Sequence, residues 1–149
     1  MIAERTYDEA RIRAILENQD ILDRISEDGG VLELDVEKQG WLLMEGAGVY
    51  MVTALNATTL EIHAHVLPDH RHRSLETGYA ALRWILDNTQ HQKVVAEIPT
   101  CYPDVIKFTQ KFGFVDEGLN RQSIRKKGRL YDQVRLGITR AEIEALFDD

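Results

Sequence analysis

The chain has 149 residues, of which 44% are hydrophobic and 29% are charged, and this length and composition predict one globular domain, residues 1–149. Its net charge of −7 argues against general nucleic-acid binding, which needs a dominant basic surface, and it has no apolar run long enough to span a membrane. The N-terminus lacks the apolar core of a signal peptide, and Cys101 is the one cysteine, so we expect a cytoplasmic protein without a disulfide.

The first part of the chain predicts a helix followed by strands. Residues 6–25 carry a helical stripe of apolar side chains, with Thr6 in the N-cap position and a break near Asn18. A turn at 28–30 then precedes four strand-like runs, at 31–36, 40–46, 48–56 and 59–67. The short spacing between these runs favours antiparallel hairpins.

The second part alternates helices with strands. We expect a helix from about 74 to 88, a central strand at 93–99 and a helix that Gly113 closes. Two strands joined at Lys127–Gly128 follow, with the basic run 121–129 as a solvated hairpin tip, and a last helix has Thr139 and Glu142 as a capping box. The order predicts an α/β fold with a mixed, mostly antiparallel central sheet flanked by helices on both sides.

Two segments carry a family resemblance. The run "VVAEIPTCYPDVIKFTQKFGFVDEG" (94–118) and the order of elements resemble the GCN5-related N-acetyltransferase (GNAT) superfamily over nearly the whole chain. The run "GRLYDQV" (128–134) is similar to the final hairpin of the ribosomal-protein acetyltransferase branch. The resemblance implies acetyl-CoA in a gap between the fourth and fifth family strands. It also implies an N-acyltransferase, in which an amine attacks the thioester directly.

The resemblance also implies a pyrophosphate-binding loop of the form (Gln/Arg)-x-x-Gly-x-(Gly/Ala) at the start of a helix, where free N–H groups and the helix dipole favour an anion. The equivalent run begins at Arg71, but His72, Ser74 and Glu76 stand where small residues are expected. Ser74 is a plausible N-cap, while Glu76 would repel a phosphate. The residues expected to bind the cofactor are Val66, Leu67, Arg71, His72, Arg73, Ser74 and Gly78.

A base for acetyl transfer is expected on the strand 59–67. Glu61, His63 and His65 alternate with apolar residues, so period two places them on one face of the sheet. Glu61 or His65 would deprotonate the acceptor amine, with Glu97 as a second candidate. A solvated sheet face is an equal alternative. The same three side chains could also hold a metal ion, but no further ligand cluster supports this and no metal is expected.

The acid that protonates the leaving thiolate is displaced in this sequence. The family often has a tyrosine four residues before the Gly-Phe pair, where this chain has Thr109. Tyr102 lies nearby and is expected to act as the acid. A backbone N–H near Val66 to Leu67 would polarise the thioester carbonyl. Cys101 could be a nucleophile, although a small buried residue is the favoured interpretation.

The alternative function is a non-catalytic GNAT-fold protein for binding or assembly, with a degenerate CoA site. The loop is similar to those of phage-encoded GNAT-like chains, which would make the protein virion-associated. The sequence differs from the family pattern at the loop, at Thr109 and at Tyr102, and these three differences together favour the alternative. The acceptor amine is not identified, and a homo-oligomer or an assembly partner is compatible with either function.

Overall fold

One sheet organises the protein in its computed structural model, which describes residues 1–148. Its seven strands lie in the order β1-β2-β3-β4-β5-β7-β6, and every neighbouring pair is antiparallel except β4 and β5. The expected mixed, mostly antiparallel α/β fold is confirmed. The strands are β1 (Ala3–Thr6), β2 (Gly40–Met44), β3 (Gly48–Ala54), β4 (Thr59–Val66), β5 (Lys93–Pro99), β6 (Val115–Lys126) and β7 (Arg129–Thr139).

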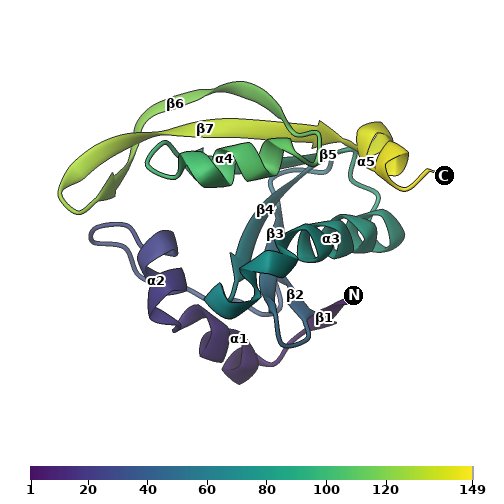
Figure 1. The fold of residues 1–149 in the computed structure, drawn as a ribbon, viewed down its shortest axis with the longest axis horizontal. Coiled ribbons are helices and arrows are strands. Elements are labelled where there is room, and N and C mark those ends of the chain that lie inside the picture. The colour runs from purple at the N-terminus through teal and green to yellow at the C-terminus, as the bar shows by residue number, and fades with distance from the viewer. Residues whose placement is uncertain (149) are drawn as a thin grey trace.

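Helices cover the sheet on both faces. The short helices α1 and α2 lie on one side of strands β2–β4, and α3 and α4 lie on the other (Figure 1). Two buried apolar clusters form as a result, a large one under α3 and α4 and a smaller one under α1 and α2. The helices are α1 (Glu9–Leu16), α2 (Gln19–Ile25), the 3-10 helix η1 (Pro68–Arg73), α3 (Ser74–Asn88), α4 (Pro103–Gln110) and α5 (Arg140–Leu146).

The N-terminal segment confirms one expectation and corrects another. The break at Asn18 is present, and its side chain caps α2 by accepting from the N–H groups of Asp20 and Ile21. Asp8, and not Thr6, is the N-cap of α1, because Thr6 belongs to the unexpected edge strand β1 and pairs with Trp41.

The run 31–36 was predicted to be a strand and is not one. Its apolar residues Leu32, Leu34 and Val36 do turn inward and pack on the smaller cluster, while Glu33 and Asp35 stay exposed. The segment pairs with no other strand within residues 1–148. The alternation of apolar and polar residues in this segment therefore reflects burial of one side of the chain, and not pairing with a neighbouring strand.

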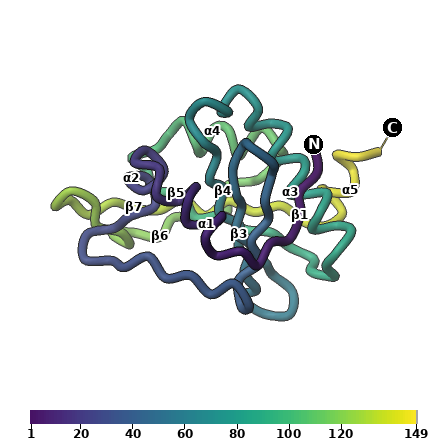
Figure 2. Tube along the Cα trace, turned by 90° about the horizontal axis from the view of Figure 1, so that it is seen from below, coloured from purple at the N-terminus to yellow at the C-terminus, as the bar shows by residue number. Residues whose placement is uncertain are grey.

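The tip of the β6–β7 hairpin docks on α2 and the loop after it, which Figures 1 and 2 both show. The Asp28 carboxylate accepts from the backbone N–H groups of Lys127 and Gly128 at 3.0 and 2.7 Å. Lys126 is 7% exposed, and its Nζ donates to the carbonyls of Asp23 and Arg24 at 2.9 and 2.8 Å. The expected solvated tip is therefore wrong at Lys126, whose charge stabilises the C-terminal end of α2.

Gly78 allows α3 to pack closely against Phe112, just after the end of α4. A Cβ built at this position would overlap the ring of Phe112, which packs edge-on against Tyr79 and Phe108. The glycine is thus required for helix packing, and this position is not free for substitution by a larger residue.

We expect Gly78→Ala to destabilise the fold, because overpacking a core costs about 1–3 kcal/mol and exceeds the gain in helix propensity of about 1 kcal/mol. Urea denaturation would measure the loss. Phe112→Leu in the Gly78→Ala background should recover part of it, since the two changes share one contact. Additive losses in the double variant would contradict this explanation.

Candidate functional site

The sheet divides between β4 and β5. The two strands pair only where Thr59, Leu60 and Glu61 face Lys93, Val94 and Val95, and they diverge beyond that point. A cleft of about 910 Å³ opens where they part, with walls from α2, β4, η1, α3, β5 and α4. The cleft reaches both faces of the sheet.

The predicted site residues divide into those that line the cleft and those that do not. Among the candidates for catalysis, His65 and Tyr102 line it, whereas Glu61 contacts it only through His63. The cofactor-binding candidates on its walls are Val66, Arg71, His72, Ser74 and Gly78, while Leu67 and Arg73 are absent from the lining.

The backbone after β4 is largely occupied by internal hydrogen bonds. The N–H of Leu67 donates to the carbonyl of Ala47 at 2.9 Å, so it is not free to polarise a thioester as expected. The N–H of His70 donates to Leu67, and the N–H of Ser74 donates to Arg71, as η1 requires. Val66 remains the candidate for the polarising contact.

Ser74 does not cap α3. It is the first residue of that helix, and its Oγ donates to the carbonyl of Arg71 at 2.7 Å. The N-cap position belongs to Arg73, which makes no capping hydrogen bond with its side chain. Ser74 was predicted to be the N-cap because it lies where the helix was expected to begin. Instead η1 runs directly into α3, so position 74 does not have the extended backbone of an N-cap residue.

Both loop arginines pair with carboxylates. Arg71 forms an ion pair with Asp20 of α2, and Arg73 lies 3.5 Å from Glu76. Asp20 also contacts Arg24 at 3.2 Å, and the pKa of its carboxyl is held below the ordinary value, first by the hydrogen bond from Arg71. An anion in the loop would therefore compete with Asp20 for Arg71.

The three polar residues of β4 share the α1–α2 side of the sheet, as their period predicts, but their environments differ. His63 Nε2 lies 2.7 Å from Glu61 Oε1, and this hydrogen bond lowers the pKa of the Glu61 carboxyl despite partial burial. His65 is 8% exposed beside Trp41, and burial lowers its pKa to about 3. His65 is therefore neutral and too weak a base for the role expected of it.

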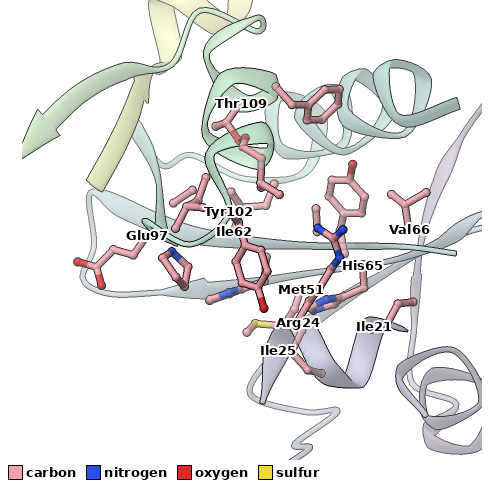
Figure 3. Close-up of a pocket in the computed structure, with 18 of the residues that line it drawn as sticks. Ile21, Arg24, Ile25, Met51, Ile62, His65, Val66, Glu97, Tyr102 and Thr109 are labelled. Atoms are coloured by element: carbon pink, nitrogen blue, oxygen red, sulfur yellow. The ribbon is translucent and has the colours of Figure 1, made fainter. Parts of the chain in front are cut away.

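Tyr102 reaches across the cleft from the start of α4. Figure 3 shows its side chain directed toward Arg24, Ile25 and Met51 on the opposite wall. Its ring lies 5.4 Å from the Arg24 guanidinium and 5.0 Å from Lys126 Nζ. Its side chain therefore lies in the cleft, beside two cationic groups.

The other polar candidates have local partners. Thr109 Oγ1 donates to the carbonyl of Val105 at 2.8 Å, and Glu97 lies 3.5 Å from Arg135. Cys101 is partly buried and outside the cleft lining. Sequence reasoning missed Asp20 and Lys126, because both act on segments far away in the chain.

Two general observations concern residues 1–148. No three histidine, cysteine or carboxylate side chains in this range come together as a metal-ligating group. Over the same residues, no helix is long and apolar enough to cross a membrane.

Comparison with solved structures identifies the fold as that of GNAT acetyltransferases. A mutant of spermidine N-acetyltransferase from Vibrio cholerae is similar with a TM-score of 0.81 and 14% identity, covering 99% of this chain and 100% of the other. The same enzyme in complex with CoA and spermine gives 0.77 and 15%, with 95% of each chain covered. Residues 3–144 match the family described as "Protein of unknown function (DUF2824)", and the chain belongs to this family. No curated protein matches the sequence.

The buried His65 predicts a pH-dependent stability. An unfolded histidine binds a proton below about pH 6.5, whereas folded His65 stays neutral until about pH 3, so the unfolded state binds more protons and stability falls as the pH drops between these values. By pH 4.5 this loss should reach about 2–3 kcal/mol. Urea denaturation from pH 7 to 4.5 would measure it. His65→Gln should flatten the profile, and an unchanged slope would contradict the assignment.

Proposed function

We propose that this protein is an acetyl-CoA-dependent N-acetyltransferase. The observation that carries the proposal is the parting of β4 and β5, which opens one cleft to both faces of the sheet. Acetyl-CoA would enter from the η1 and α3 side, and an amine from the α1–α2 side. The likeness in fold to an enzyme whose structure contains CoA and spermine supports this arrangement.

The Glu61–His63 pair is the proposed base. His63 lines the cleft with its side chain 37% exposed, and Glu61 orients its imidazole and stabilises the positive charge after proton uptake. The free amine then attacks the thioester carbonyl carbon, the carbon–sulfur bond breaks, and the Tyr102 hydroxyl donates a proton to the thiolate. The tyrosinate then takes up the proton that the new amide nitrogen loses, so the acetyl group ends on the amine and CoA leaves as the thiol. The N–H of Val66 would stabilise the developing oxyanion.

The phosphates of CoA would be held at η1 by an exchange of partners. Arg71 is paired with Asp20 in the free protein. A diphosphate that replaced Asp20 as the partner of Arg71 would leave Asp20 paired only with Arg24. Ser74 and His72 lie on the same wall of the cleft, with Glu76 in the first turn of α3 opposing an anion. This site should accordingly bind CoA weakly.

A direct prediction concerns Asp20. Asp20→Asn should tighten CoA binding several-fold by releasing Arg71, whereas Arg71→Ala should weaken it about tenfold or more, the usual worth of a charged hydrogen bond. Calorimetry on the purified chain would measure both affinities. Asp23→Asn is the matched control, since it removes the same charge from the same helix and, within residues 1–148, its carboxylate hydrogen-bonds only to Gln19. Equal affinities in all three variants would remove this loop from the site.

A second prediction concerns the base. His63→Gln and Glu61→Gln should lower kcat for acetyl transfer by about 10²- to 10⁴-fold while leaving CoA affinity unchanged, because a base acts in the transition state. Thiol release, corrected for acetyl-CoA hydrolysis, would report turnover. His91→Gln changes a histidine outside the cleft lining and serves as the control. Full turnover in both variants would refute the assignment.

The second candidate function is a non-catalytic GNAT-fold binding or assembly protein. The specific observation in its favour is that both loop arginines are already paired and that Thr109 replaces the usual tyrosine. CoA titration separates the two functions, since a chain that does not bind CoA cannot be the proposed enzyme. Fold by itself does not distinguish them.

A further inference from the structure

We infer that the acceptor is a monoamine that carries an apolar group, and not a polyamine; this inference rests on the proposed function and concerns the same cleft. The relevant space is the part of the cleft on the α1–α2 side, here named the acceptor chamber. Its walls are Ile25, Leu32, Trp41, Met51 and Tyr102.

The chamber beside the proposed base is apolar. Met51 of β3 lies directly opposite His63 in the β3–β4 pairing, and Trp41 lies opposite Met51 on the next strand. Ile25 and Leu32 are partly buried against the same cluster as Met51, and Figure 3 shows Ile25 and Met51 below Tyr102. An amine bound at His63 would therefore have its substituent among apolar side chains.

Two positive charges lie beside the chamber. Arg24 and Lys126 lie close to the ring of Tyr102, and Lys126 is buried with backbone carbonyls as its partners. Within residues 1–148, Lys126 makes no ion pair with a carboxylate. A second ammonium group in the chamber would lose water and meet Lys126, which has no carboxylate partner, and Arg24, whose carboxylate partners are Asp20 and Asp104.

Carboxylates near the chamber already have basic partners, such as Glu61 beside His63 and Asp20 beside Arg24. Glu97 is paired with Arg135, and Asp104 lies 4.0 Å from Arg24. Glu27 and Glu33 line the outer rim and are exposed, so water screens their attraction for a cation. The chamber thus favours a single positive charge, at the reacting amine, followed by an apolar substituent that is removed from water on binding.

Isopentylamine and 1,4-diaminobutane test this inference, because they have similar length and differ in an apolar or a charged far end. We expect kcat/KM to be at least about tenfold higher for isopentylamine. Leu32→Glu should reduce or reverse this ratio by placing a carboxylate on the chamber wall. Leu55→Glu adds the same charge at an exposed leucine outside the cleft and should leave the ratio unchanged.

A preference for the diamine in the natural chain, or a ratio that Leu32→Glu does not move, would overturn the inference. If neither amine is acetylated, turnover does not rank them, and equilibrium dialysis of the two amines against the CoA-saturated chain decides the acceptor class. If CoA does not bind, the same dialysis is done with the chain alone. Tighter binding of isopentylamine that Leu32→Glu abolishes would support the inference in either case.

Discussion

The short parallel pairing of β4 with β5 is the constraint on which the site depends. β4 is held along its full length by β3, and β5 along its full length by β7, so only three residue pairs join the two halves of the sheet. The twist of each half then separates the strands beyond Glu61. This separation opens the cleft, and it leaves His63, Tyr102 and the backbone of β4 facing a common space.

Long-range polar contacts organise the entrance to that space. Asp20 holds Arg71, while Asp28 and the carbonyls at the end of α2 hold the tip of the β6–β7 hairpin. The segment from α2 to β2 is thereby tied to the η1 side of the cleft and to the β6–β7 hairpin. Ligand binding at Arg71 would thus be linked to the position of α2, because Asp20 contacts both Arg71 and Arg24.

The similarity to spermidine N-acetyltransferase is a similarity of fold at 15% identity, and it does not assign roles to the residues of this chain. Here a histidine–glutamate pair, a tyrosine at the start of α4 and an apolar chamber occupy the cleft. These groups suit removal of a proton from an amine. They are less suited to holding a molecule with several positive charges.

Local patterns in the sequence were sufficient to predict β2 to β7, the helices α3 to α5, the break at Asn18 and the shared face of Glu61 and His63. Such features depend on periodicity and capping, which act over a few residues. Only the tertiary structure decided that 31–36 forms no strand, that burial makes His65 a weak base, and that Arg71 is engaged by a carboxylate 51 residues away. Burial and ion pairing depend on which distant segments meet, and no local pattern records that.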